Sequence, residues 1–208
     1  FHRVLDEINR KFNHCAIAVH EPVGIEDEFE HIIDLMTMEL VSFAGSNHED
    51  VERHPLPEAL HETAQARRDI MLETLSDYSD DVALLYLEGE EVPADLIQRQ
   101  LRELTIQNRV VPVFLGAAKK RVGIQPLMDA VTACLPSPPE AGVVTARRMK
   151  DGENVAIQPD ETEPFAGLVF KVTAGTSADL LYVRTYAGRL KAGGTYFNSR
   201  TKKKLKIK

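Results

Sequence analysis

Apolar side chains recur at helical spacing in several stretches of the first 135 residues. An apolar residue at every third or fourth position marks the buried face of an amphipathic helix. The pattern predicts helices over residues 1–12, 58–75, 80–87, 93–108 and 124–135. Gly89 suits the end of one helix, and Pro93 suits the first turn of the next, where its missing N–H breaks no hydrogen bond.

Shorter apolar runs between these helices predict strands. Residues 15–19 and 110–115 each suffice for one strand, and residues 31–43 favour two strands or one bent ribbon. The run at 110–115 is apolar almost throughout, which is typical of a strand buried within a parallel sheet. Pro22 and Gly24 predict a turn, and residues 44–50 predict a polar loop.

A proline-rich segment divides the chain. Pro136, Pro138 and Pro139 cannot continue a helix and give a stiff, extended linker. Beyond it the pattern changes to β-type runs separated by glycine-containing turns, at residues 143–146, 165–173, 180–186 and 195–198. The second part of the chain is therefore predicted to be an all-β module, of which a barrel is the simplest form.

The net charge of −7 conceals a strong asymmetry. Residues 21–54 hold ten acidic side chains and one arginine, and residues 58–91 hold ten acidic side chains and two arginines. Residues 189–208 hold eight basic side chains and no acidic one. Such blocks indicate a basic protein partner for the acidic part and RNA for the basic end, although solvated faces explain most charge runs.

Familiar catalytic and metal-binding motifs are absent from the sequence. It contains no G-x-x-x-x-G-K-[ST], G-x-G-x-x-G, C-x-x-C, H-E-x-x-H or G-x-S-x-G, so we assign no catalytic residue and no metal ligand. No apolar run is long enough to cross a membrane. Cys15 and Cys134 lie far apart, which favours a reducing, cytoplasmic setting. The chain begins inside a helical pattern, so we expect it to be a piece of a longer protein.

Several motifs in a consistent order closely resemble elongation factor G, the translocation GTPase. They are YLEGEE at 86–91, VVPVFLGAAKKRVGIQPLMDAV at 110–131, LPSP at 135–138, EPFAGLVFK at 163–171 and RTYAG at 184–188. The resemblance covers nearly the whole chain. It implies an α/β fold, a partial G domain with an α+β insertion, followed by an incomplete all-β barrel domain of the translation-factor type.

The resemblance also implies a division of the chain. Residues 1–14 and 110–136 would be the C-terminal part of the GTP-binding domain, residues 15–109 the inserted subdomain, residues 137–142 a linker, and residues 143–208 part of the barrel. The phosphate-binding loop, both switch segments and the N-K-x-D motif would precede Phe1. We therefore expect GTP or GDP with Mg²⁺ to be bound by the full-length GTPase, and expect this chain alone to be inactive and to hold no nucleotide.

Gly116, Ala117, Ala118 and Lys119 match the family's last guanine-contacting loop. A loop at the C-terminal end of a buried parallel strand presents its amides at the crevice where α/β sheets bind ligands. The resemblance implies that the amide of Ala118 reads the base carbonyl and that Lys119 covers one face of the base. The family usually has Ser where this chain has Ala117, which leaves the packing of the loop open. Without the resemblance, an ordinary strand-to-helix turn explains these residues.

The inserted subdomain of the family engages the ribosomal stalk protein. The candidate contacts are Glu73, Asp77, Asp80 and Asp81; the first three share one helical face if the helix continues through this segment. Their mutual repulsion would be relieved by a basic partner. A solvated acidic face is the alternative.

The resemblance implies that the β module approaches ribosomal RNA. Lys202, Lys203 and Lys204 are the candidate RNA contacts, and lysines that protect a strand edge are the alternative. The loop at 174–179 reads AGTSAD, whereas the family more often has an Asp-Pro pair and a glycine. That departure leaves the geometry of the loop toward RNA open.

The function implied is that of part of a cytoplasmic elongation factor G-like GTPase that moves tRNA and mRNA through the ribosome. We expect a monomer whose partners are the stalk protein and ribosomal RNA, with no membrane or DNA partner. Two alternatives stay open: a related ribosome-acting GTPase of the protection or release type, and a non-enzymatic protein-binding module.

Overall fold

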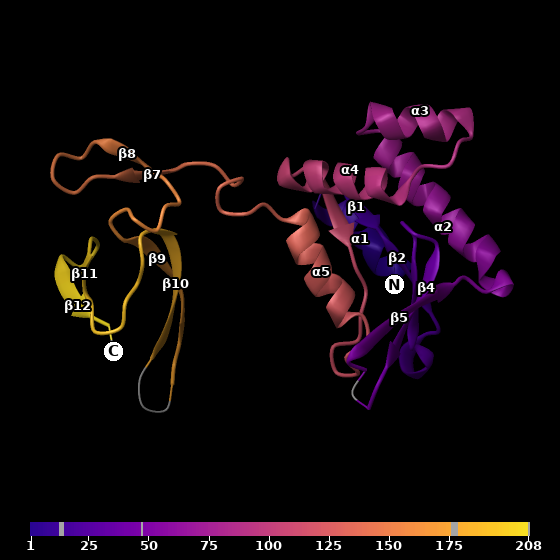
Figure 1. The fold of residues 1–208 in the computed structure, drawn as a ribbon, viewed down its shortest axis with the longest axis horizontal. Coiled ribbons are helices and arrows are strands. Elements are labelled where there is room, and N and C mark those ends of the chain that lie inside the picture. Colours follow the sequence, from indigo (N-terminus) through magenta and orange to yellow (C-terminus); the bar gives the residue numbers. More distant parts are fainter. Residues whose placement is uncertain (13–14, 47, 176–178, 208) are drawn as a thin grey trace. The chain divides into compact units, whose positions relative to one another are not determined.

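The computed structural model describes residues 1–12, 15–46, 48–175 and 179–207. The chain forms two compact units, Phe1–Leu135 and Pro136–Lys208, which are treated separately below (Figure 1). The mixed α/β character of the first unit and the all-β character of the second confirm the predicted fold class. Within the part of the chain that is described, no helix is long and apolar enough to cross a membrane.

The first unit contains all the helices of the described residues. Its elements are α1 (His2–Phe12), β1 (Cys15–Ala18), β2 (His20–Val23), the 3-10 turn η1 (Glu26–Glu28), β3 (His31–Asp34), β4 (Glu39–Ala44), β5 (Asp50–Pro55), α2 (Glu58–Ser76), α3 (Asp80–Glu88), α4 (Ala94–Ile106), β6 (Val110–Val113) and α5 (Ile124–Cys134).

Two sheets meet at Val19. Strand β1 pairs in parallel with β6, from Cys15 opposite Val110 to Ala18 opposite Val113. Strands β2, β3, β4 and β5 form an antiparallel sheet in that order. The Val19 amide donates to the Val113 carbonyl at 3.2 Å, while the Val19 carbonyl accepts from the Leu35 amide at 3.0 Å. The chain therefore passes from the parallel pair directly into the antiparallel sheet.

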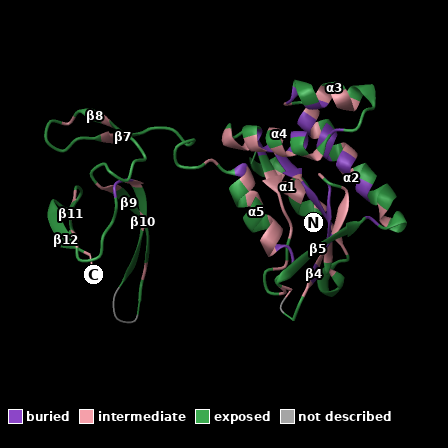
Figure 2. Cartoon of the chain, viewed as in Figure 1, coloured by how far each residue is buried: buried purple, intermediate pink, exposed green. Residues whose placement is uncertain are grey.

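The core of this unit joins the sheets to α2 and α4 (Figure 2). Ile17, Val19 and Leu35 from the strands pack in one cluster with Leu75 of α2 and Ile97 of α4, all of them buried. Each fully buried side chain of this size stabilises the fold by about 1.5–3 kcal/mol relative to its exposed state. This apolar contact fixes the helices on the strands.

A buried arginine links three segments of the chain. The Arg68 guanidinium, on α2 and only 7% exposed, donates to the carbonyls of Leu35, Met36 and Val92 at 2.5, 2.7 and 2.7 Å. Burial lowers the pKa of Arg68, while Glu91 and other carboxylates oppose that effect. The arginine thus ties α2 to the turn after β3 and to the connection between α3 and α4.

The sequence pattern missed two strands of this sheet. Strand β2 occupies the segment for which Pro22 predicted a turn, and its Pro22 stands opposite Ile32 in the pairing with β3. Strand β5 pairs with β4 from Asp50 to Pro55, where no element was predicted. All residues of β5, the edge strand of this sheet, are exposed, and its sequence carries no regular apolar alternation to reveal it.

The second unit consists of local antiparallel pairs. They are β7 (Val144–Arg147) with β8 (Asn154–Ile157), β9 (Ala166–Thr173) with β10 (Leu180–Ala187), and β11 (Thr195–Asn198) with β12 (Lys203–Lys206). Strand β8 was not predicted. The described strands of this unit do not close into a barrel, because no ladder joins one pair to another.

One histidine, His20, is buried in the first unit with an unsatisfied ring nitrogen. His20 is 2% exposed, packs edge-on against Phe114 at 5.0 Å between ring centroids, and its Nδ1 has no hydrogen-bond partner among the described residues. Burial lowers the pKa of His20 from 6.5 to about 4. The positive charge of Arg53 lowers this pKa further, and the negative charge of Asp34 partly opposes both effects.

This histidine makes the stability of the first unit depend on pH. As the pH falls from about 6.5 to 4, the unfolded chain binds a proton at His20 before the folded chain does. The free energy of unfolding is therefore highest above pH 6.5 and falls by roughly 3 kcal/mol as the pH is lowered toward 4. Urea unfolding followed by circular dichroism at 222 nm measures it, because the described helices all lie in this unit.

His20→Leu is expected to flatten this pH dependence, while His54→Asn on the exposed strand β5 leaves it unchanged. An equally steep loss of stability in His20→Leu would contradict the assignment to His20.

Candidate functional site

The loop after β6 closes into a small hairpin. Ala117 and Val122 form a two-way bridge, in which the Ala117 amide donates to the Val122 carbonyl at 2.9 Å and the Val122 amide donates back at 3.3 Å. The Lys120 amide also donates to the Ala117 carbonyl at 2.9 Å, which makes residues 117–120 a β-turn. The predicted residues Ala117, Ala118 and Lys119 thus lie in this turn, and Gly116 directly precedes it.

Two glycines allow the strand end and the return segment to approach closely. A Cβ atom on Gly116 would lie 2.8 Å from the Val122 carbonyl oxygen. Gly123 has a φ of +78°, and a Cβ there would lie 2.4 Å from the Leu115 carbonyl oxygen. Side chains at these positions would separate the strand from the start of α5, so the glycines are required by the shape of the turn.

The segment between β1 and β6 braces one side of the turn. The Lys120 ammonium donates to the carbonyls of Glu26 and Asp27 at 3.3 and 2.8 Å, and the Lys120 carbonyl accepts from His48 Nδ1 at 2.7 Å. Gln125 at the start of α5 donates to the His48 carbonyl at 2.7 Å. These bonds hold the hairpin in place without using the side chains of residues 116–119.

The other side of the turn is open. Gly116, Ala118 and Lys119 are exposed, and Ala117 is half-buried. Within the described ranges, the Ala118 amide donates no hydrogen bond, whereas both backbone groups of Ala117 are used. This arrangement leaves a free N–H donor on a small residue, with a lysine next to it, at the carboxyl end of a parallel strand. A flat ring with a carbonyl group fits such a surface.

The acidic candidates do not lie on one continuous helix. Helix α2 ends at Ser76, and Ser79 caps a new helix by accepting from the Val82 amide at 3.3 Å. The expectation that Asp80 shares a helical face with Glu73 and Asp77 is therefore wrong. The chain begins the new helix α3 at Asp80 and does not continue α2, because the Ser79 hydroxyl accepts a hydrogen bond from an amide in the first turn of α3.

The helix dipoles act differently on two pairs among these four acidic residues. Asp80 and Asp81 lie in the first turn of α3, where the helix dipole favours negative charge. Glu73 and Asp77 lie in the last turn and at the C-cap of α2, where the dipole disfavours it. Asp80 and Asp81 thus have a structural explanation, whereas Glu73 and Asp77 carry an exposed charge that costs stability.

The basic candidates occupy the end of the β11–β12 hairpin. Lys202 lies in the turn with a φ of 59°, and its ammonium contacts the Met149 sulfur at 3.4 Å. Lys203 and Lys204 are opposite Asn198 and Phe197, so successive strand positions direct them to different faces. The structure thus places the three lysines close together in the chain but not on one face.

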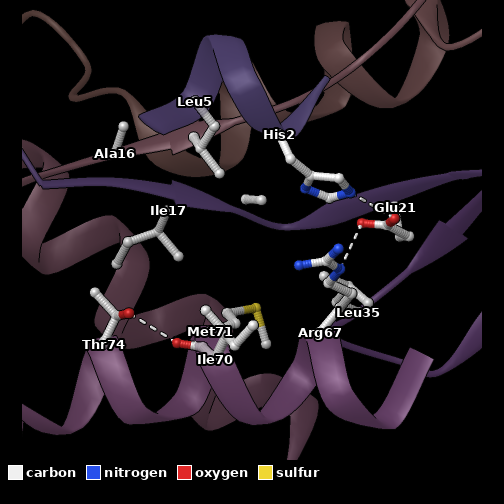
Figure 3. Close-up of a pocket in the computed structure, with 11 residues that line it drawn as sticks. His2, Leu5, Ala16, Ile17, Glu21, Leu35, Arg67, Ile70, Met71 and Thr74 are labelled. Carbon is white, nitrogen blue, oxygen red and sulfur yellow. Dashed lines mark hydrogen bonds and ion pairs between the residues drawn. The ribbon is translucent and has the colours of Figure 1, made fainter. Parts of the chain in front are cut away.

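A small cavity lies beside a buried carboxylate, between α1, β1 and α2 (Figure 3). Glu21 is 6% exposed; its Oε1 lies 2.9 Å from His2 Nε2 and its Oε2 lies 3.6 Å from Arg67 Nε. The cavity has a volume of about 60 Å³ and mainly apolar walls, apart from the polar groups of His2, Glu21, Arg67 and Thr74. We assign the Glu21 cluster a structural role, joining α1 to α2.

The acidic, histidine and cysteine side chains of the described residues are dispersed. No group of three or more His, Cys, Asp or Glu side chains lies close enough together there to hold an ion. The sequence analysis did not predict every contact around the turn. What it missed is the bracing of the turn by Glu26, Asp27 and His48, because contacts between distant loops leave no periodic signal.

Comparisons with known proteins identify relatives along almost the whole chain. Elongation factor G of Thermotoga petrophila is 42% identical over 200 residues, and that of Thermotoga maritima is 41% identical over the same length. Both matches cover 96% of this chain and 29% of the relative, so the chain spans under a third of their length. No protein-family model matches the sequence.

A solved structure has a similar fold. A crystal structure of a Thermus thermophilus protein matches with a TM-score of 0.66 at 21% sequence identity, covering 99% of this chain and 28% of that one. At this level of identity the likeness concerns the fold alone.

Proposed function

Because the chain belongs to the elongation factor G family, we propose that it supplies one side of the guanine pocket of a GTPase that drives ribosomal translocation. In the complete protein this GTPase works as a cytoplasmic monomer and binds GTP or GDP with Mg²⁺. The residues that cleave GTP lie outside the segment described here, so the chain alone does not hydrolyse GTP. Its own contributions are recognition of the base and contact with the ribosome.

The observation that carries the base-binding role is the open side of the turn after β6. Ala118 offers an unused amide to the carbonyl oxygen of guanine, and the small side chains of Gly116 and Ala118 let the flat base approach. Lys119 covers one face of the ring. Ala117 replaces the serine usual in the family, but its backbone groups already close the hairpin, so the missing hydroxyl is not needed for that closure.

Ala118→Pro in the full-length factor is expected to weaken GDP binding at least tenfold. Proline removes the N–H but suits this second position of the turn, so the backbone shape is kept. A tenfold loss is about 1.4 kcal/mol, in the range of one hydrogen bond to a buried carbonyl. Fluorescence titration with a labelled GDP measures the affinity. Ala118→Ser keeps the amide and should bind within twofold of the parent; equal binding by Ala118→Pro would contradict the role.

A second contribution is contact with the ribosomal stalk protein through the acidic end of α2. Glu73 and Asp77 are four residues apart and exposed, and they lie where the dipole of α2 disfavours their charge. A basic partner surface relieves both the mutual repulsion and the unfavourable dipole. Asp80 and Asp81, at the start of α3, add to the negative potential but also serve their own helix.

Reversing both charges, Glu73→Lys with Asp77→Lys, is expected to slow ribosome-stimulated GTP hydrolysis of the full-length factor at least fivefold at low salt. Loss of electrostatic steering is the physical reason, and the difference should shrink as salt rises. Glu58→Lys with Glu62→Lys, the same charge change at the other end of α2, is the control. Unchanged GTP turnover of the Glu73→Lys, Asp77→Lys variant at low ionic strength would contradict the proposed stalk contact.

The third contribution is contact between the β11–β12 hairpin and ribosomal RNA. Lys204 and Lys206 lie two positions apart on β12 and hence on one face, opposite Phe197 and Thr195. Lys202 lies in the turn, and Lys203 lies on the other face of β12, so neither shares the face of Lys204 and Lys206. The phosphate contacts are therefore assigned mainly to Lys204, with Lys206 beside it.

Lys204→Gln is expected to weaken binding of the full-length factor to ribosomes and to reduce the steepness of its salt dependence by roughly one phosphate contact. Sedimentation at several salt concentrations measures both quantities. Lys203→Gln, which removes the same charge from the other face, should have the smaller effect. Equal slopes for the parent and Lys204→Gln would count against an RNA contact on this face.

A further inference from the structure

A second, smaller apolar cluster of the first unit joins the turn after β6 to the antiparallel sheet. Its members come from β3, from β4 and from the segment after β6: Ile32, Val41, Phe43 and Val122, with Leu115 and Ala117 packed against them. Apolar contact of this kind has no preferred direction. The cluster therefore holds the turn against the sheet but does not by itself set where the backbone amides of the turn point.

Lys120 adds directional contacts at both of its ends. Its ammonium donates to the carbonyls of Glu26 and Asp27 at 3.3 and 2.8 Å, and its own carbonyl accepts from His48 Nδ1 at 2.7 Å. His48 is held in turn, because Gln125 donates to the His48 carbonyl at 2.7 Å. We refer to these four hydrogen bonds as the Lys120 contacts.

Three residues at the Lys120 contacts have a backbone conformation that side-chain-bearing residues rarely adopt. The φ angle is 54° at Glu26, 56° at His48 and 60° at Arg121, which follows Lys120 directly. A left-handed φ costs conformational free energy at a residue with a Cβ atom, so it persists only where surrounding contacts hold it. The meeting of three such residues at one turn indicates that its geometry is maintained against a local cost.

The position of Lys120 determines the direction of the Ala118 N–H. That N–H and the Ala117 carbonyl belong to one planar peptide group. The Ala117 carbonyl accepts from the Lys120 amide at 2.9 Å and from the Val122 amide at 3.3 Å. Contacts that fix Lys120 therefore also fix the plane of this peptide group, and with it the line along which the Ala118 N–H points.

The Lys120 contacts are separable from the contacts that stabilise the fold. The Lys120 side chain is 35% exposed, and the Asp27 carboxylate, 3.8 Å from its ammonium, is fully exposed. Water replaces hydrogen bonds and ion pairs at the surface with little loss of stability. The apolar cluster and the β1–β6 pairing remain when these bonds are lost, so we expect their loss to affect the orientation of the turn more than its folding.

We propose that Lys120 is a positioning residue for the guanine base: its contacts with Glu26, Asp27 and His48 aim the Ala118 N–H at the base carbonyl. This inference rests on the proposed base recognition and assigns part of it to residues that do not touch the base. A binding group must be held within a small angle of its productive direction to contribute fully, and its supporting contacts provide that. The strands and loops between β1 and β6 are thus part of the scaffold of the nucleotide site.

The test is titration of the full-length factor with a fluorescently labelled GDP. Lys120→Met keeps the length of the side chain but removes its donor, and should weaken binding roughly fivefold or more. Lys120→Arg keeps a donor for the two carbonyls and should bind within about threefold of the parent. Lys11→Met, which removes an exposed ion pair with Glu7 inside α1, is the control and should bind within about twofold.

A double-mutant cycle with Ala118→Pro tests whether Lys120 acts through the Ala118 amide. Once proline has removed the N–H, there is no donor left to aim, so Lys120→Met should weaken binding by less than about a further twofold. The melting temperature of nucleotide-free Lys120→Met should stay within about 2 °C of that of the parent, because the contacts lie at the surface. A purely structural role of Lys120 would predict neither result.

The outcomes separate this inference from the base recognition on which it rests. If Ala118→Pro weakens GDP binding and Lys120→Met does not, the positioning role is overturned and base recognition stands. If the losses of the two variants multiply in the double variant, Lys120 acts independently of Ala118 and the inference is also overturned. If Ala118→Pro has no effect, both proposals fail. If Lys120→Met does not fold, His48→Ala, which removes the donor to the Lys120 carbonyl, replaces it in the same cycle.

Discussion

The parallel pairing of β1 with β6 is the interaction on which the rest of the first unit depends. It joins residues 15–18 to residues 110–113, so the segment between these two strands begins and ends at one place. The pairing fixes where β6 stops, and hence where the turn of residues 116–119 lies. It also fixes Val19, from which the antiparallel sheet starts. Without this ladder, neither the turn nor the insertion would have a defined position.

Polar contacts made by cationic side chains to backbone carbonyls refine that arrangement. Arg68 holds the turn after β3 and the connection between α3 and α4 against α2, and Lys120 holds the hairpin against Glu26 and Asp27. In each case a charged group satisfies carbonyls that have no strand partner. The segment between β1 and β6 thereby supports the turn that we propose for base recognition, because Lys120 of the hairpin donates to carbonyls of that segment.

The acidic residues of α2 and α3 differ in how the helix dipoles act on their charge. Aspartates at the start of α3 are explained by the dipole of their own helix. Carboxylates at the end of α2 are placed against the dipole of their helix. The stalk contact that we propose depends on this cost, because a basic partner relieves it.

The sequence by itself determined the helices, the apolar strands β1 and β6, the position of the turn at residues 116–119 and the kinship with elongation factor G. These features depend on local periodicity, on glycine and proline chemistry, and on motif order, all of which are readable along the chain. Strands β2, β5 and β8 escaped because short or exposed strands show little apolar alternation.

Only the tertiary structure decided three features. A serine cap separates Asp80 from the helix that carries Glu73, Lys203 and Lys204 point to different faces of β12, and the buried Arg68 guanidinium donates to three backbone carbonyls. The last of these depends on contacts between segments distant in the chain. Burial and hydrogen-bond partners of that kind are set by packing, not by the spacing of residue types.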